Sequence, residues 1–120
     1  MAKILLVDDA MFVRETIKKM IEAHGHIVVG EAENGELAIE RYRELQPELV
    51  LLDITMPGMS GIEALSKIKD IDSAAKVIIC SSMGQQSFIA EAIQLGALDF
   101  IIKPFKEEQV MAALDKALLK

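Results

Sequence analysis

Short apolar runs alternate five times with segments of helical periodicity along this chain. The runs are rich in Ile, Val and Leu and show little alternation with polar residues, which is typical of strands in a parallel sheet covered on both faces. The pattern predicts strands at residues 3–7, 27–31, 49–52, 76–80 and 99–102.

The segments between these runs carry apolar residues three or four positions apart, as in amphipathic helices. Two boundary signals agree with this prediction: Ser60 and Glu63 form a capping-box pattern, and Gly25 and Gly96 stand where helices should end. The predicted apolar faces are Val13, Ile17, Met20 and Ile21; Ala38, Tyr42 and Leu45; Leu65, Ile68 and Ile71; Phe88, Ala92 and Leu95; and Val110, Leu114, Ala117 and Leu118. Together these elements predict an α/β fold of (βα)5 type with right-handed crossovers.

Length and composition narrow the class of protein. We expect residues 1–120 to form one domain without a second domain, because 120 residues suit one compact core. The net charge of -6 disfavours nucleic-acid binding. No apolar run approaches the ~20 residues of a membrane helix, and no signal peptide is visible, so we expect a cytoplasmic monomer. Cys80 lies inside an apolar run and is expected to be inert packing.

Polar side chains follow four of the five predicted strands. Carboxylates come after the first and third strands, hydroxyls after the fourth and an ammonium after the fifth. In parallel strands these groups meet at one edge of the sheet, where acids repel one another unless a cation or a proton joins them. The pattern therefore predicts an Mg²⁺ site with one carboxylate left to react. The residues are Asp8, Asp9, Asp53, Ser81, Ser82 and Lys103.

Four motifs together resemble the signatures of the response-regulator receiver domain. They are Val7-Asp8-Asp9, the stretch from Leu52 to Gly61, Cys80-Ser81-Ser82, and Phe100 to Phe105 around Lys103-Pro104. The similarity covers essentially the whole chain in order. The resemblance implies a doubly wound flavodoxin-like fold with strand order 2-1-3-4-5. It also suggests that the Lys103-Pro104 bond is cis.

The resemblance implies a role for each acid. Asp53 would be phosphorylated by the phosphohistidine of a histidine kinase, forming an acyl phosphate. Asp8, Asp9, Asp53 and the backbone carbonyl of Thr55 would bind one Mg²⁺. On this interpretation the protein is a phosphoacceptor that also loses its phosphoryl group unaided, and not a conventional turnover enzyme.

The resemblance also implies a switch. Lys103 would pair with the phosphoryl group, Ser81 would turn inward to donate a hydrogen bond to it, and Phe100 would swing into the space vacated by Ser81. Phe100 stands where Tyr is common, so an output contact through a phenol is lost. The surface expected to change comprises the fourth helix, the fifth strand and the fifth helix. Thr55 and Met83 are candidates for tuning dephosphorylation, and since neither is a base or an amide, we expect slow unaided hydrolysis.

Within the family, the stretch from Ser82 to Gln86 favours a single-domain chemotaxis regulator. Its partners would be a chemotaxis kinase, the flagellar motor switch protein and a phosphatase. A receiver of a phosphorelay or one excised from a transcriptional regulator stays an alternative. An FMN carrier would share the fold, although Asp8 and Asp9 would repel its phosphate. An Mg²⁺-dependent aspartyl-phosphate hydrolase usually needs an acid where Thr55 stands.

Simpler interpretations stay open for each residue alone. Asp8, Asp9 or Ser81 could cap a helix, and Lys103 could be a solvated charge at a strand end. His24 and His26 flank Gly25 without an evident third metal ligand and are interpreted as surface turn residues.

Overall fold

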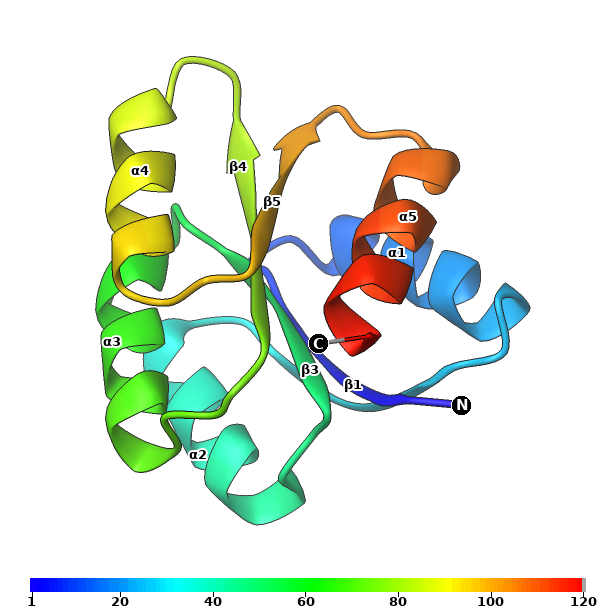
Figure 1. Cartoon of the computed structure of the whole chain (residues 1–120), viewed down its shortest axis with the longest axis horizontal. Coiled ribbons are helices and arrows are strands. Elements are labelled where there is room, and N and C mark those ends of the chain that lie inside the picture. The colour runs from blue at the N-terminus through cyan, green and yellow to red at the C-terminus, as the bar shows by residue number, and fades with distance from the viewer. Residues whose placement is uncertain (120) are drawn as a thin grey trace.

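The computed structural model describes residues 1–119 and shows a five-stranded parallel sheet with helices on both faces (Figure 1). The strands lie in the order β2-β1-β3-β4-β5, so the predicted fold and strand order are confirmed. The chain reverses its direction of winding between β1 and β3, which are neighbours, and ligands bind at such switch points in open α/β sheets. The strands are β1 (Lys3–Val7), β2 (Ile27–Ala32), β3 (Leu49–Asp53), β4 (Val77–Ser82) and β5 (Asp99–Lys103).

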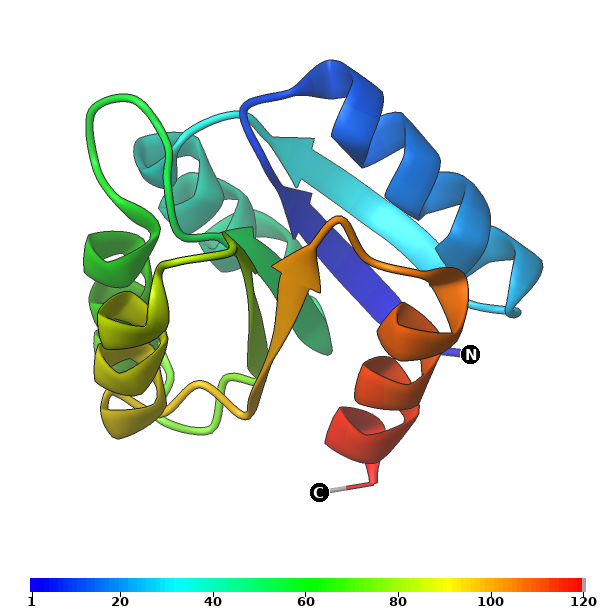
Figure 2. The ribbon, with the colours of Figure 1, turned by 90° about the horizontal axis from the view of Figure 1, so that it is seen from above.

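Three helices cover one face of the sheet and two cover the other (Figures 1 and 2). α2 (Gly35–Leu45), α3 (Gly61–Ile71) and α4 (Gln86–Gln94) form the first layer, and α1 (Met11–Ala23) and α5 (Glu107–Leu118) form the second. These bounds all fall within the segments predicted to be helical.

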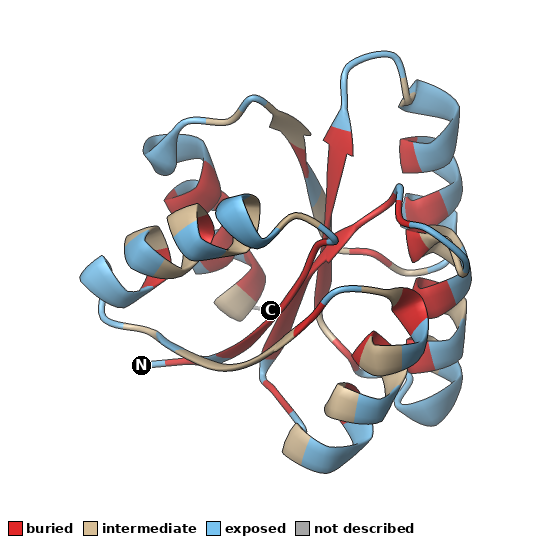
Figure 3. Ribbon diagram, turned by 180° about the vertical axis from the view of Figure 1, so that it is seen from behind, coloured by how far each residue is buried: buried red, intermediate tan, exposed pale blue. Residues whose placement is uncertain are grey.

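Side chains that alternate along each strand feed two separate cores. Leu5 and Val7 of β1 pack in the core under α2, α3 and α4, whereas Ile4 and Leu6 pack in the core under α1 and α5. The central strands β1, β3 and β4 are therefore buried on both faces, whereas the edge strands β2 and β5 are more exposed. Each helix is buried only along its inner stripe (Figure 3). Cys80 is buried in the second core, as expected of an inert packing residue.

Most strand boundaries differ from the predicted ones by one or two residues. β4 begins at Val77 and continues through Ser81 and Ser82, and β2, β3 and β5 each include one more residue than predicted. The prediction ended the third, fourth and fifth strands where their apolar runs ended. Backbone pairing continues beyond it, because the ladder needs peptide groups and not apolar side chains: Ser82 pairs with Lys103 across β4 and β5.

The predicted face of α4 was partly wrong. Ala92 is buried as expected, but its buried companion is Ile89, and Phe88 and Leu95 are exposed. This helix is apolar over a broad arc, so periodicity alone did not select the inward stripe. Ile71, the last residue of α3, is also more exposed than predicted.

The predicted helix boundaries hold where the backbone requires particular residues. The Ser60 hydroxyl accepts a hydrogen bond from the Glu63 amide at 3.2 Å, one half of the predicted capping box. Gly25 and Gly96 have φ angles of 90° and 109°, the left-handed conformation that ends helices.

Candidate functional site

Three carboxylates meet at the carboxyl edge of the sheet, as the sequence predicted. Asp8 follows β1 and Asp53 ends β3, two strands whose pairing places Val7 opposite Leu52. One oxygen each from Asp8, Asp9 and Asp53 lies within 4.8 Å of the others. Asp8 and Asp53 are buried and Asp9 is exposed. The fold thus places acids from two strands around one point.

Close backbone packing fixes Asp53 in place. Gly61 begins α3 directly against the carbonyl group of Asp53, where a Cβ atom would clash, and its amide donates to the Ile54 carbonyl at 2.7 Å. Asp53 Oδ1 accepts a hydrogen bond from the Thr55 amide at 3.3 Å. Glycine at position 61 therefore permits the close approach of α3 to the phosphoacceptor candidate.

Lys103 supplies the cation of the site. Its Nζ donates to Asp8 Oδ2 at 2.7 Å and lies 3.6 Å from Asp53 Oδ2. Its interpretation as a solvated charge is therefore wrong. The Lys103-Pro104 peptide bond is cis, as the resemblance implied.

The charges of the cluster do not balance, because three carboxylates surround one ammonium group. The pKa of Asp53 is raised to about 6, chiefly because the carboxyl is buried. Lys103 and the Thr55 amide lower this pKa, whereas the charges of Asp8 and Asp9 raise it. Burial alone would lower the pKa of Lys103, but its hydrogen bond to Asp8 and the charge of Asp53 outweigh burial and raise it. Three acids facing one ammonium leave excess negative charge at the edge of the sheet.

The donor set fits a divalent cation. Three carboxylates from two adjacent loops offer oxygen ligands, the type that Mg²⁺ prefers, and the exposed Asp9 leaves the site open to water. A cation there would offset the repulsion that Lys103 alone does not remove. Asp8, Asp9, Asp53 and the carbonyl of Thr55 are the candidate ligands.

Ser81 and Phe100, which the resemblance assigns to a switch, differ in their burial. The Ser81 side chain is fully buried (0% exposed), and its Oγ has no hydrogen-bond partner among the described residues. Phe100 on β5 points outward and is 43% exposed. Ser81 does not cap α4, whose N-cap is Gln85, so the capping interpretation is wrong.

Asp8 and Asp9 do not cap α1 either. The N-cap of α1 is Ala10, without a side-chain capping bond. Instead, Asp8 Oδ1 accepts from the Ala10 amide at 2.9 Å within a tight turn, which leaves Oδ2 for Lys103.

Sequence reasoning missed two residues that support the site. Arg14 Nη1 donates to the backbone carbonyl of Asp8 at 2.6 Å while its Nε donates to Glu31 at 2.8 Å, so a guanidinium buttresses the turn that carries the acids. Gln85 donates from Nε2 to Thr55 Oγ1 at 2.6 Å, and its Oε1 accepts from the Ser82 amide at 2.7 Å. Nothing in the sequence around Arg14 predicts its bonds to the Asp8 carbonyl and to Glu31. Gln85 belongs to the stretch from Ser82 to Gln86, whose sequence indicated only a resemblance to chemotaxis regulators.

The two tuning candidates have different surroundings. Thr55 is exposed and hydrogen-bonded to Gln85, whereas Met83 is exposed beyond the end of β4. Neither residue is a base or an amide, but Gln85 places its amide on Thr55.

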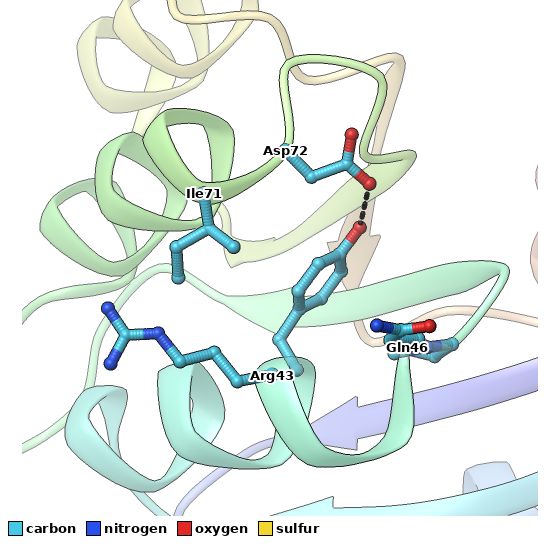
Figure 4. A pocket seen from close by; sticks show the side chains of 6 residues that line it. Arg43, Gln46, Ile71 and Asp72 are labelled. Carbon is cyan, nitrogen blue, oxygen red and sulfur yellow. Dashed lines mark hydrogen bonds between the residues drawn. The ribbon is translucent and has the colours of Figure 1, made fainter.

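A second polar group of residues lies at the opposite edge of the sheet (Figure 4). Tyr42 of α2 donates from its hydroxyl to Asp72 Oδ2 at 3.0 Å, in a hollow lined also by Arg43, Gln46 and Ile71. Burial, followed by the hydrogen bond and charge of Asp72, raises the pKa of Tyr42 to about 12. This hollow lies between α2 and the segment after α3, and the hydrogen bond between Tyr42 and Asp72 joins the two.

The structure brings Asp115 to the two histidines, which the sequence did not predict. His24 Nε2 lies 3.4 Å from Asp115 Oδ2. His26 Nδ1 accepts a hydrogen bond from the Ala2 amide at 2.9 Å, so a neutral ring carries its proton on Nε2 and offers no second lone pair to a metal. The group is therefore interpreted as part of the contacts between α1, β2 and α5.

The described part of the chain contains no helix that is both long and apolar enough to cross a bilayer.

Comparison with known proteins identifies the family. The pattern of the response regulator receiver domain matches residues 4–115. The chain belongs to the response regulator receiver family. This receiver domain is 54% identical over 116 residues to chemotaxis protein CheY of Bacillus subtilis, with 97% of each chain covered. It is 52% identical over 114 residues to CheY of Thermotoga maritima, with 95% of each covered.

A solved structure agrees with the fold and the family. The CheX–CheY–BeF3–Mg²⁺ complex from Borrelia burgdorferi superposes on the receiver domain with a TM-score of 0.94 and 32% identity, covering 98% of this chain and 90% of the other. The domain is therefore CheY-like, which supports a place in two-component signalling and chemotaxis.

Proposed function

We propose that this receiver domain accepts a phosphoryl group on Asp53 from the phosphohistidine of a chemotaxis-type histidine kinase. The observation that carries the proposal is the convergence of Asp8, Asp9 and Asp53 with Lys103 at the switch point of the sheet. A solvated charge or a helix cap needs no such convergence. The family and the CheY relatives supply independent support.

The transfer forms one bond and breaks one. An oxygen of Asp53 attacks the phosphorus atom, the bond between phosphorus and the kinase imidazole nitrogen breaks, and the nitrogen keeps the electron pair. Asp53 must be ionised to attack, and with its pKa near 6 it is ionised at neutral pH. Mg²⁺ would be held by Asp8, Asp9, Asp53 and the Thr55 carbonyl. Its positive charge would offset the negative charge of the phosphoryl oxygens.

Two further side chains would sense the added phosphoryl group. Lys103 already lies 3.6 Å from Asp53, so a phosphoryl oxygen can draw it away from Asp8. The buried Ser81 hydroxyl has no partner within residues 1–119, so it gains a hydrogen bond when an acceptor arrives. These gains favour a second packing of α4, β5 and α5, and Phe100 would move inward with them.

The output we propose is phosphorylation-dependent binding of a chemotaxis partner to the face formed by α4, β5 and α5. We propose the flagellar motor switch protein as this partner, because two relatives that are 54% and 52% identical to this chain are chemotaxis proteins. On this proposal the domain is a phosphoacceptor that slowly hydrolyses its own acyl phosphate, assisted by a phosphatase, and not a turnover enzyme.

Labelling with acetyl phosphate and Mg²⁺ tests the acceptor. Wild-type protein should gain one phosphoryl group, and Asp53→Asn should gain none. Labelling that persists in Asp53→Asn would place the acceptor elsewhere. Binding to a motor-switch peptide with and without beryllofluoride then tests the output, and binding that ignores beryllofluoride would contradict it.

A further inference from the structure

A hydrogen-bonded clasp centred on Gln85 connects the two loops that flank Asp53. One loop follows β3 and contains Thr55, and the other follows β4 and contains Gln85 itself. Gln85 Nε2 donates to Thr55 Oγ1 at 2.6 Å, and Gln85 Oε1 accepts from the Ser82 amide at 2.7 Å. The orientation of the amide is fixed, because a backbone N–H can only donate and must therefore face the oxygen.

The use of this side chain is unusual for its place in the fold. Gln85 is the N-cap residue of α4, and the side chain of an N-cap residue often bonds the free amides of its own helix. Gln85 makes no such cap and reaches Thr55, thirty positions earlier in the sequence. Its bond to Thr55 therefore contributes to tertiary positioning and not to local helix capping.

The clasp is continuous with the reacting group. The Thr55 amide donates to Asp53 Oδ1 at 3.3 Å, so one residue contacts both Asp53 and Gln85. At the other end, Ser82 is bonded covalently to Ser81, whose hydroxyl is buried and unpartnered. A line of contacts thus runs from Asp53 through Thr55, Gln85 and Ser82 to Ser81.

We propose that Gln85 is a positioning residue that sets the lifetime of the phosphoryl group and couples Asp53 to Ser81. The clasp holds the Thr55 loop beside Asp53 through one N–H and the oxygen of the Gln85 amide. Without the clasp, the loops separate and water gains access to the acyl phosphate. The proposal rests on the proposed function, because a lifetime exists only if Asp53 is phosphorylated.

The variant Gln85→Met tests the clasp, because Met has a similar length but makes neither hydrogen bond. The matched control is Gln86→Met, an exposed neighbour at the start of α4 for which no side-chain hydrogen bond is observed. We expect Gln85→Met to hydrolyse its phosphoryl group three- to tenfold faster than wild type, about the factor that one hydrogen bond contributes. Hydrogen exchange of the Ser82 amide should accelerate by a similar factor, and Gln86→Met should match wild type in both measurements.

A double-mutant cycle separates positioning from general loosening. Thr55→Val removes the hydroxyl that Gln85 contacts while keeping the shape of the side chain. In that background Gln85→Met should accelerate hydrolysis less than it does in the wild-type background, because one of the two bonds is already gone. Equal acceleration in both backgrounds would overturn the link through Thr55.

The outcomes distinguish this proposal from the proposed function. If wild-type protein takes no label from acetyl phosphate, the proposed function fails. If wild type is labelled and Gln85→Met keeps the wild-type lifetime, only the positioning role of Gln85 is overturned, whether or not Ser82 exchange changes. Thermal unfolding of each variant identifies a general loss of stability, which by itself would not produce the predicted dependence on Thr55.

Discussion

The two ends of the sheet differ in how their polar groups are satisfied. At the amino edge, Tyr42 is hydrogen-bonded to Asp72, and Lys69 Nζ donates to the carbonyls of Ser73 and Ala75 at 2.7 and 3.0 Å. At the carboxyl edge, three acids face Lys103, and the buried hydroxyl of Ser81 has no partner among the described residues.

The difference shows where this fold stabilises itself and where it keeps groups ready for chemistry. Paired polar groups at the amino edge connect helices to the loops before the strands. At the carboxyl edge, unbalanced negative charge and a buried hydroxyl without a partner among the described residues destabilise the protein. A bound cation would offset the charge, and a phosphoryl group would accept a hydrogen bond from the hydroxyl. Substitutions should therefore have opposite effects on stability at the two ends.

The largest expected effect is at Asp53. The folded protein holds the proton of this carboxyl more tightly than the unfolded chain does, since its pKa is raised from 3.8 to about 6. Metal-free wild type therefore loses stability as the pH rises from about 4 to 6, by about 3 kcal/mol in total. Asp53→Asn should avoid this loss and be more stable than wild type at pH 7.5, measured by urea unfolding in EDTA. If Asp53→Asn is less stable than wild type at pH 7.5, ionised Asp53 does not destabilise the folded protein and this prediction is wrong.

Mg²⁺ affinity should distinguish the acids at the two ends. Asp9→Ala removes one of three carboxylates at the cluster and should weaken Mg²⁺ binding at least tenfold, measured by calorimetry. Asp72→Ala is the matched control, an acid removed from the amino edge, and should leave the affinity unchanged. Unchanged affinity in Asp9→Ala would place the cation elsewhere.

Ser81→Ala should stabilise the protein or leave it unchanged, although it removes a side chain that we assign to the switch. The buried Oγ has no partner to lose, so its removal relieves an unsatisfied group worth about 1 kcal/mol. The same variant should lose phosphorylation-dependent partner binding. A drop in the free energy of unfolding of more than this amount would show that the hydroxyl is already bonded.

Tyr42→Phe should show the reverse behaviour at the amino edge. Loss of the hydrogen bond to Asp72 should lower the free energy of unfolding by about 1 kcal/mol at pH 7. Because the pKa of Tyr42 is raised from 10.0 to about 12, wild type loses stability as the pH rises from 10 towards 12, and the difference between the two proteins should narrow. Labelling by acetyl phosphate should be unaffected.

The predicted convergence of polar side chains at one edge of the sheet is confirmed, because strand ends are readable in a linear sequence. Asp8, Asp53 and Lys103 each terminate an apolar run, and parallel strands bring their carboxyl ends to one edge whatever the loops do. The inward face of α4 was not readable, since an apolar arc that includes Phe88 and Ile89 offers more than one stripe to the sheet. Burial there is decided by how the helix docks.

The sequence by itself determined the alternation of strands and helices, the placement of acids and Lys103 at strand ends, and the family. Those features depend on periodicity and on short motifs, which are local. Tertiary structure alone decided that Lys103 bonds Asp8, that Ser81 is buried without a partner, and that Gln85 bridges to Thr55. Each of these features involves segments that are far apart in the sequence. It therefore depends on how the helices and loops pack and not on any local pattern.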